Sequence, residues 1–316
     1  MDVCVLGAGS LGSVIGGCLA RSGHEVTLVT RNEAHVAAIR ERGLRLTDDD
    51  HTVRVDVSAS TSARELEPPD LIVVLVKSFD TTSAIESARH LVTPDTVVLT
   101  LQNGVGCEQL IGEVVGADRV IAGRTFVGGR IIGPGVVEYG VVGRRTVLGE
   151  LDGSRSNRLQ RVGEAFEEAG LVVDLSSDIV AMMWEKLFVN VATGAWSALT
   201  GLPYGELSVH EDVEHMAVAT VAEAISVARA LDIAVTTTDP TEPWRRAWEG
   251  LPAGFKASML QSVEKGARTE VDVMHGAVCA GGRRAGVATP INDTLLAAVH
   301  GLERRLRLER RLRLDG

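Results

Sequence analysis

A lysine stands inside an apolar stretch of the chain, the segment 182–191, which reads MMWEKLFVNV. Only four of the 32 lysine and arginine residues are lysines, so arginine supplies the ordinary surface charge. In a helix, Lys186, Asn190 and Gly194 recur at every fourth position and line one face. A positioned ammonium can stabilise the alkoxide formed by hydride transfer to a ketone and supply its proton, whereas a guanidinium keeps its charge. The alternative for Lys186 is a half-buried lysine that reaches solvent.

Polar residues also follow two apolar, strand-like segments. Lys77 follows LIVVLV, and Gln102, Asn103 and Gly104 follow VVLTL. Ligands of open α/β sheets bind at the carboxyl ends of the strands, so we predict that Lys77 and Asn103-Gly104 belong to a site. A solvated strand end and a plain Asn-Gly turn are the alternatives.

Two more polar residues lie in the predicted helix 258–282. Ser258 precedes Gln261 by three positions, the spacing of a capping box, but its hydroxyl could also hold a substrate carboxylate. Glu270 is either a surface residue or, beside a site, a group that orients a hydroxyl or the Lys186 ammonium. No histidine has the spacing of a triad or a metal site, and we expect no metal.

The sequence GAGSLG predicts a dinucleotide site, because Gly7, Gly9 and Gly12 follow a strand-like segment and precede a helical one. The glycines allow a tight turn, a close approach to the pyrophosphate and close packing of helix on strand. The predicted cofactor-binding residues of this loop are Gly7, Ala8, Gly9, Ser10, Leu11 and Gly12. A glycine-rich turn without a ligand is the alternative.

The end of the second strand indicates which cofactor is bound. A site for NAD usually carries Asp or Glu there, whereas this chain has Thr30 followed by Arg31. A guanidinium can bind a 2′-phosphate by paired hydrogen bonds, so Arg31 favours NADP(H). Glu33 nearby weakens this prediction, and a plain surface arginine is the alternative.

The elements that must position these residues divide the chain into two halves. Apolar strands alternate with helices up to about residue 120, which predicts a Rossmann-type parallel sheet, and residues 120–150 are expected to extend it with antiparallel strands. From Asp178 onward helices are predicted over 179–199, 210–231, 258–282 and 290–313. The predicted domains are therefore an NADP-binding domain (1–176) and an all-α substrate and dimerisation domain (177–316).

Composition excludes several classes of function. A net charge of −10 argues against nucleic acid as a partner. Neither a signal peptide nor an apolar run of membrane-spanning length is apparent, so we expect no membrane partner. The four cysteines lack metal-ligand spacing and indicate a reducing, cytoplasmic location. The arginine-rich C-terminal tail is expected to be a solvated helix.

In order and spacing, the segments GAGSLGS, VKSFDT, LQNGVG, WEKLFVN, SMLQSVEKGARTEVD and GVATPIND resemble ketopantoate reductase (2-dehydropantoate 2-reductase) over roughly residues 1 to 300. The resemblance implies NADPH-dependent reduction of 2-dehydropantoate to pantoate, a step towards coenzyme A. It also implies a C-terminal domain like that of 6-phosphogluconate dehydrogenase.

The resemblance assigns roles to individual residues. Lys186 is implied to be the catalytic acid, with Glu270 beside it. Lys77 and Asn103 are implied to place cofactor and substrate, and Arg31 to meet the 2′-phosphate. Asn190, Ser258 and Glu270 are implied to bind the substrate.

The chain departs from the family pattern at Gly194, where an asparagine is common, and in the segment LTGLPYGEL. A reductase of another branched 2-oxo acid and an NADPH-binding sensor without catalysis therefore stay open as alternatives. A homodimer is a further possibility.

Overall fold

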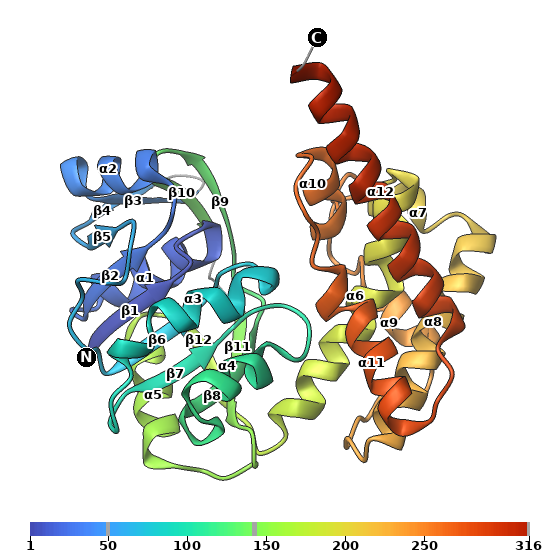
Figure 1. Ribbon diagram of the computed structural model, residues 1–316, viewed down its shortest axis with the longest axis horizontal. Coiled ribbons are helices and arrows are strands. Elements are labelled where there is room, and N and C mark those ends of the chain that lie inside the picture. Colours follow the sequence, from blue (N-terminus) through green and yellow to red (C-terminus); the bar gives the residue numbers. More distant parts are fainter. Residues whose placement is uncertain (49–50, 141–143, 315–316) are drawn as a thin grey trace. The chain divides into compact units, whose positions relative to one another are not determined.

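The computed structural model describes residues 1–48, 51–140 and 144–314, and the chain divides into two compact units (Figure 1). The first unit comprises residues 1–102 and 107–179, and the second comprises residues 103–106 and 180–316. The short segment 103–106 thus leaves the first unit and belongs to the second. The division into domains 1–176 and 177–316 stays a prediction.

An eight-stranded sheet forms the centre of the first unit, in the order β12-β11-β8-β7-β6-β1-β2-β5. The six strands from β8 to β5 are parallel to one another, and β11 is antiparallel to β8. Its strands are β1 (Asp2–Leu6), β2 (Glu25–Val29), β5 (Ser58–Ser60), β6 (Leu71–Val74), β7 (Val97–Thr100), β8 (Val120–Thr125), β11 (Arg145–Glu150) and β12 (Val172–Leu175). The predicted parallel sheet is confirmed. Of the region expected to extend it, β11 does so as an antiparallel strand, whereas β8 joins the sheet in parallel.

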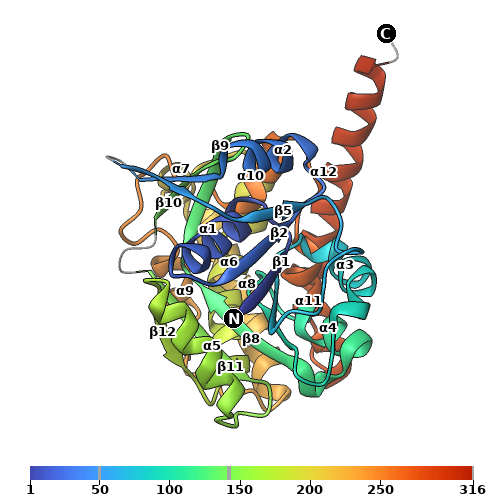
Figure 2. The ribbon, with the colours of Figure 1, turned by 90° about the vertical axis from the view of Figure 1, so that its left-hand side faces the viewer.

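The central strands are apolar on both faces because each face contributes to a different core. In β1, Val3 and Val5 belong to one core, and Cys4 and Leu6 belong to the other. Helices α1 (Ser10–Arg21) and α5 (Asn157–Glu168) contribute to the first core, and α3 (Thr81–Ser87) and α4 (Cys107–Val115) contribute to the second. The strand β5 and the pair α5 and β12 lie at opposite ends of the sheet (Figure 2).

A second, four-stranded sheet corrects one expectation from the sequence. Strands β9 (Gly128–Gly133) and β10 (Val136–Gly140) do not extend the main sheet but pair with β3 (Leu44–Thr47) and β4 (Thr52–Val55) in the order β4-β3-β10-β9. Residues 141–143 of the predicted strand region lie outside the described part of the chain. Helix α2 (Glu33–Arg42) precedes β3, and Gly43 follows it with a φ of 74°.

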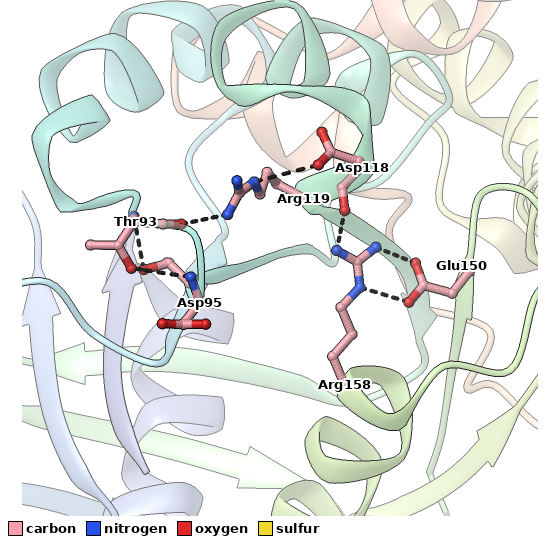
Figure 3. Close-up of polar contacts among 7 residues, drawn as sticks. Thr93, Asp95, Asp118, Arg119, Glu150 and Arg158 are labelled. Carbon is pink, nitrogen blue, oxygen red and sulfur yellow. Dashed lines mark hydrogen bonds and ion pairs between the residues drawn. The ribbon is translucent and has the colours of Figure 1, made fainter.

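A polar cluster joins α5 and the end of β11 to the 3₁₀ turn η3 (Ala117–Arg119), which precedes β8 (Figure 3). The guanidinium of Arg158 on α5 donates to both carboxylate oxygens of Glu150, at 2.8 and 2.5 Å, and also to the backbone carbonyl of Asp118. Next to it, Arg119 donates to the Thr93 carbonyl at 2.6 Å. Glu150 is buried, so Arg158 neutralises a carboxylate that would otherwise lie unpaired inside the unit.

The second unit is helical, as predicted. Its helices are α6 (Ile179–Thr200, which starts at the last residue of the first unit), α7 (Tyr204–Leu207), α8 (Glu211–Ala230), α9 (Thr241–Arg246), α10 (Ser258–Glu264), α11 (His275–Ala285) and α12 (Pro290–Leu314). Within this unit, the last turns of α12 extend beyond the other helices (Figure 1), and Leu308 and Leu312 there are exposed. Residues 315–316 of the predicted tail lie outside the described residues.

The predicted helix 258–282 was wrong as one continuous element. Helix α10 ends at Glu264, two residues before Gly266. Gly266 has a φ of 61° and donates its N–H to the Val263 carbonyl, while Ala267 donates to the Ser262 carbonyl. This pair of bonds is a Schellman motif, which only a residue that tolerates a left-handed conformation can close. A 3₁₀ turn, η4 (Val271–Val273), then leads into α11.

Among the described residues, no helix has both the length and the apolar character that a membrane span requires.

Candidate active site

The loop between β1 and α1 has the geometry of a dinucleotide cradle. Gly7 has a φ of 102°, and a side chain there would overlap the backbone of Leu75 and Val76. A side chain on Gly12 would overlap the Gly7 carbonyl, whereas a Cβ on Gly9 would have no atom within 4 Å apart from those of Gly9 and its two chain neighbours. The loop is therefore closed on the protein side and open on the side where a pyrophosphate would approach.

The hydrogen bonds of this loop leave donors on its open side. The amides of Gly7 and Ala8 both donate to the Val29 carbonyl, at 3.0 and 2.9 Å, which fixes the loop against β2. The N-cap residue of α1 is Gly9, and no side chain caps the helix there. The amides of Ser10, Leu11 and Gly12 have no intrahelical acceptor, because they belong to the first turn. Such amides bind phosphate oxygens, so the loop fits a dinucleotide.

Arg31 lies two residues after β2, at the position from which we predicted the choice between the two nicotinamide cofactors. Its side chain is 84% exposed, and it donates to the Asp80 carboxylate at 2.5 Å. Asp80 belongs to the 3₁₀ turn η1 (Ser78–Asp80), and exposed Lys77 directly precedes this turn. Asp80 was not anticipated, because only folding brings it to Arg31 from 49 positions away.

Gln102 organises the ends of the neighbouring strands β6 and β7 in the first unit. Its side-chain nitrogen donates to the Val76 carbonyl and to the Thr81 hydroxyl, both at 2.8 Å, and its oxygen accepts from Thr100 at 3.0 Å. One amide side chain thus ties the end of β6 to the first residue of α3. The predicted polar strand ends of Lys77 and Gln102 therefore come from adjacent strands.

In the second unit, the ammonium of Lys186 donates to the side-chain oxygen of Asn103 at 2.9 Å. Lys186 lies on α6, while Asn103 lies in the segment that follows β7, 83 positions earlier. Both side chains are half-buried. The contact brings together two residues that we predicted independently, one from a helical face and one from a strand end.

Gly104 explains how Asn103 reaches this position. It has a φ of 86°, and a side chain there would overlap the Val273 carbonyl in η4. The next amide, that of Val105, donates to the same Val273 carbonyl at 3.0 Å. The Asn-Gly pair is therefore a close-packed turn in the second unit. A residue with a Cβ at position 104 could not form it without strain.

The remaining predicted residues of this unit lie on α6, at the start of α10 and directly before η4. Glu270 precedes η4 and is only 8% exposed, so the alternative of a surface residue was wrong. Asn190 lies one turn beyond Lys186 and is half-buried. A Cβ on Gly194, a further turn along, would lie 3.6 Å from the methyl carbon of Met259 at the start of α10.

Ser258 is the first residue of α10 and is exposed. The N-cap is Ala257, without a side-chain hydrogen bond, so the capping box that we considered for Ser258 does not form. The second unit therefore contributes an ammonium, two amides, a hydroxyl and a carboxylate, a set that suits a small, polar 2-oxo acid.

A glycine loop of this shape on a doubly wound sheet is typical of nicotinamide-dependent oxidoreductases, and a lysine held by an amide can act as a proton donor. The profile of the family "Ketopantoate reductase PanE/ApbA" matches residues 3–153, and that of "Ketopantoate reductase PanE/ApbA C terminal" matches residues 178–303. The chain belongs to the ketopantoate reductase family, as its motifs predicted.

Individual relatives agree with this assignment. The chain is similar to the 2-dehydropantoate 2-reductase of Halobacterium salinarum, with 35% identity over 96% of this chain and 99% of the relative. It is also similar to the structure of a PanE/ApbA family ketopantoate reductase from Ralstonia eutropha (TM-score 0.89, 33% identity, 97% of this chain and 100% of that one). A D-mandelate dehydrogenase solved with NADH and anilino(oxo)acetate has a TM-score of 0.88 at 26% identity, with 97% and 100% coverage.

Proposed function

We propose that this protein reduces the 2-oxo group of 2-dehydropantoate to the alcohol of pantoate with NADPH. The observation that carries the proposal is the hydrogen bond from Lys186 to Asn103, in a chain of this family whose glycine loop fits a dinucleotide. When bound, the nicotinamide supplies a hydride to the carbonyl carbon. The residues of the second unit then have to bind the acid and deliver one proton.

Lys186 is the proposed general acid. As the carbonyl carbon accepts the hydride, negative charge develops on its oxygen, and the ammonium stabilises this charge and then transfers its proton. Asn103 holds the ammonium in place through its side-chain oxygen. Asn190 and Ser258 are proposed to bind the hydroxyl and carboxylate of the substrate, and Glu270 to orient the substrate hydroxyl or the ammonium.

The cofactor is held by the first unit. The amides of Ser10, Leu11 and Gly12 bind the pyrophosphate, with Gly7, Ala8 and Gly9 shaping the loop. Arg31 binds the 2′-phosphate of NADPH by exchanging Asp80 for the phosphate as its partner, because a doubly charged phosphate is the stronger acceptor. Lys77, together with Asn103 and Gly104, is proposed to help to place the cofactor.

We also propose that the protein is a homodimer and that it is cytoplasmic. Leu199, Val209 and Met216, on α6, before α8 and on α8, are large apolar residues exposed in the second unit, and such side chains are typical of an interface. Size-exclusion chromatography with light scattering tests the dimer.

The four cysteines are buried free thiols, the state that a reducing compartment such as the cytoplasm maintains.

Oxidation of NADPH, followed by its absorbance, tests the proposed function with 2-dehydropantoate and a panel of other branched 2-oxo acids. The proposal expects turnover with 2-dehydropantoate at the highest kcat/KM of the panel. A higher kcat/KM for another oxo acid would assign a different substrate. Tight binding of NADPH without turnover on any member would identify a sensor instead of an enzyme.

A further inference from the structure

A buried histidine in the first unit plays no part in the function described so far. His35 lies on α2 and is fully buried. Its Nδ1 accepts the backbone N–H of Gly135 at 3.0 Å, and its Nε2 lies 3.1 Å from the hydroxyl of Ser13. A backbone N–H only donates, so Nδ1 must carry a lone pair, and the hydrogen of the neutral ring is on Nε2. Burial also lowers the pKa of His35, which favours the neutral ring.

The Ser13 hydroxyl connects His35 to the glycine loop through a second hydrogen bond. Since His35 donates to its oxygen, the Ser13 hydroxyl is free to donate its own hydrogen, and it lies 3.4 Å from the Ala8 carbonyl. Ser13 is fully buried on α1, and its backbone N–H donates to the Gly9 carbonyl at 2.9 Å. A directed chain of donors therefore runs from Gly135 through His35 and Ser13 to Ala8.

This series of hydrogen bonds begins at the four-stranded sheet, which packs against α1. Gly135 lies in the turn between β9 and β10. On β9, Ile131 donates its N–H to the hydroxyl of Ser10 at 3.3 Å, and a side chain on Gly129 would lie 2.6 Å from Val14 of α1. The sheet thus contacts the first turn of α1 directly and, through His35, the loop that precedes it.

We propose that His35 and Ser13 are positioning residues for the cofactor. They hold the Ala8 carbonyl and the start of α1, so that the amides of Ser10, Leu11 and Gly12 keep the spacing that a pyrophosphate needs. The inference rests on the proposed binding of a dinucleotide by this loop. The pyrophosphate is common to NADPH and NADH, so loss of these hydrogen bonds weakens the binding of both cofactors equally. A change at Arg31 affects only the binding of the 2′-phosphate.

The test compares His35→Leu, His35→Gln and Ser13→Ala in the full-length protein, with His90→Leu at an exposed histidine of the same unit as the control. The dissociation constants of NADPH and NADH are measured from nicotinamide fluorescence, and kcat at saturating NADPH. Leucine removes both ring nitrogens, while the amide of glutamine can accept from Gly135 and donate to Ser13 without titrating.

We expect His35→Leu and Ser13→Ala to raise both dissociation constants by the same factor, about three- to tenfold for one internal hydrogen bond, with kcat within about twofold. His35→Gln restores wild-type affinity, and the double variant His35→Leu/Ser13→Ala is no weaker than either single variant, since both break one chain. Unchanged dissociation constants, or a loss that glutamine does not rescue, would overturn the inference.

Ser13→Ala keeps the test decisive if His35→Leu does not fold, because it removes a single oxygen and must raise both dissociation constants on its own. A wild-type protein that binds neither nucleotide would refute the proposed function itself. Wild-type binding with unaffected variants would refute only the positioning role.

Discussion

The ammonium of Lys186 and the side-chain oxygen of Asn103 are joined by a hydrogen bond of 2.9 Å across 83 positions of sequence. The contact exists because residues 103–106 pack with the helical unit and not with the sheet from which they emerge. The proposed acid is therefore oriented by the loop that follows strand β7. A change that moves this loop should lower kcat more than it weakens cofactor binding by the first unit.

Gly104→Ala tests this dependence. The added methyl group would overlap the Val273 carbonyl at a positive φ, so the loop must shift and Asn103 with it. We expect kcat to fall by about tenfold or more, since small displacements of positioning groups cost catalysis strongly. Gly106→Ala is the matched control, because Gly106 also has a positive φ but a Cβ there would meet no atom within 4 Å beyond Gly106 and its two chain neighbours. Equal kcat values for the two variants would contradict the account.

Arg31→Ala tests the choice of cofactor. Removal of the guanidinium takes away the partner of the 2′-phosphate, and we expect the dissociation constant of NADPH to rise by about three- to thirtyfold at this exposed position. The constant for NADH should stay within about twofold, because NADH lacks the phosphate. Fluorescence titrations of both nucleotides provide the measurement, with Arg54→Ala, an exposed arginine of the same unit, as control. A parallel loss of both affinities would argue against a 2′-phosphate site.

Much of the first unit follows from the sequence, because local patterns determine it. The glycine loop and the apolar central strands need only neighbouring residues to be recognised. The placement of β9 and β10 does not follow in this way, since their pairing with β3 and β4 joins segments about ninety positions apart, as Val136 and Arg45 illustrate. Their alternation of side chains is the same whichever sheet they join.

The candidate site shows the same limit. Lys186 and Asn190 were predictable from helical spacing, and Arg31 from its place after a strand. Asp80, His35 and Ser13 carried no such signal, because their roles depend on partners brought together by tertiary folding. The contact of Gly104 with Val273 likewise joins the segment after β7 to a turn far along the chain. An Asn-Gly pair signals a turn but not the surface on which the turn packs.

The stability of the second unit should depend on pH through His275. This histidine is fully buried, and burial lowers its pKa to about 4, although its hydrogen bond with Asn292 acts in the opposite direction. The unfolded chain takes up a proton near pH 6.5, before the folded one does, so the stabilising contribution is complete above pH 6.5 and is lost as the pH falls towards 4. The loss amounts to about 3 kcal/mol.

Urea unfolding followed by tryptophan fluorescence measures this loss, because Trp184, Trp196, Trp244 and Trp248 all lie in the second unit. His275→Gln should flatten the dependence of the unfolding free energy on pH between 6.5 and 4. The exposed control His210→Gln should keep the wild-type dependence. If the two variants behave alike, His275 is not the responsible group.

Arg158→Met should destabilise the first unit. The substitution keeps much of the side-chain volume but leaves the buried carboxylate of Glu150 without its two charge-assisted hydrogen bonds. We expect the free energy of unfolding to fall by about 2–3 kcal/mol, less than for a fully buried pair because Arg158 is partly exposed. Urea unfolding by far-UV circular dichroism checks this, with Arg161→Met at an exposed position of the same helix as control. A loss no larger than that of the control would show that the pair contributes little.

The role of Lys186 as proton donor is the central claim, and hydride transfer in single turnovers with 2-dehydropantoate and saturating NADPH tests it most directly. Lys186→Ala should slow NADPH oxidation by about 100- to 10,000-fold while leaving the dissociation constant of NADPH within about threefold. Lys186→Arg should not restore the rate, because a guanidinium does not release its proton. Lys265→Ala, at an exposed lysine of the same unit, should react like the wild type. A Lys186→Ala variant that oxidises NADPH at near the wild-type rate would contradict the account.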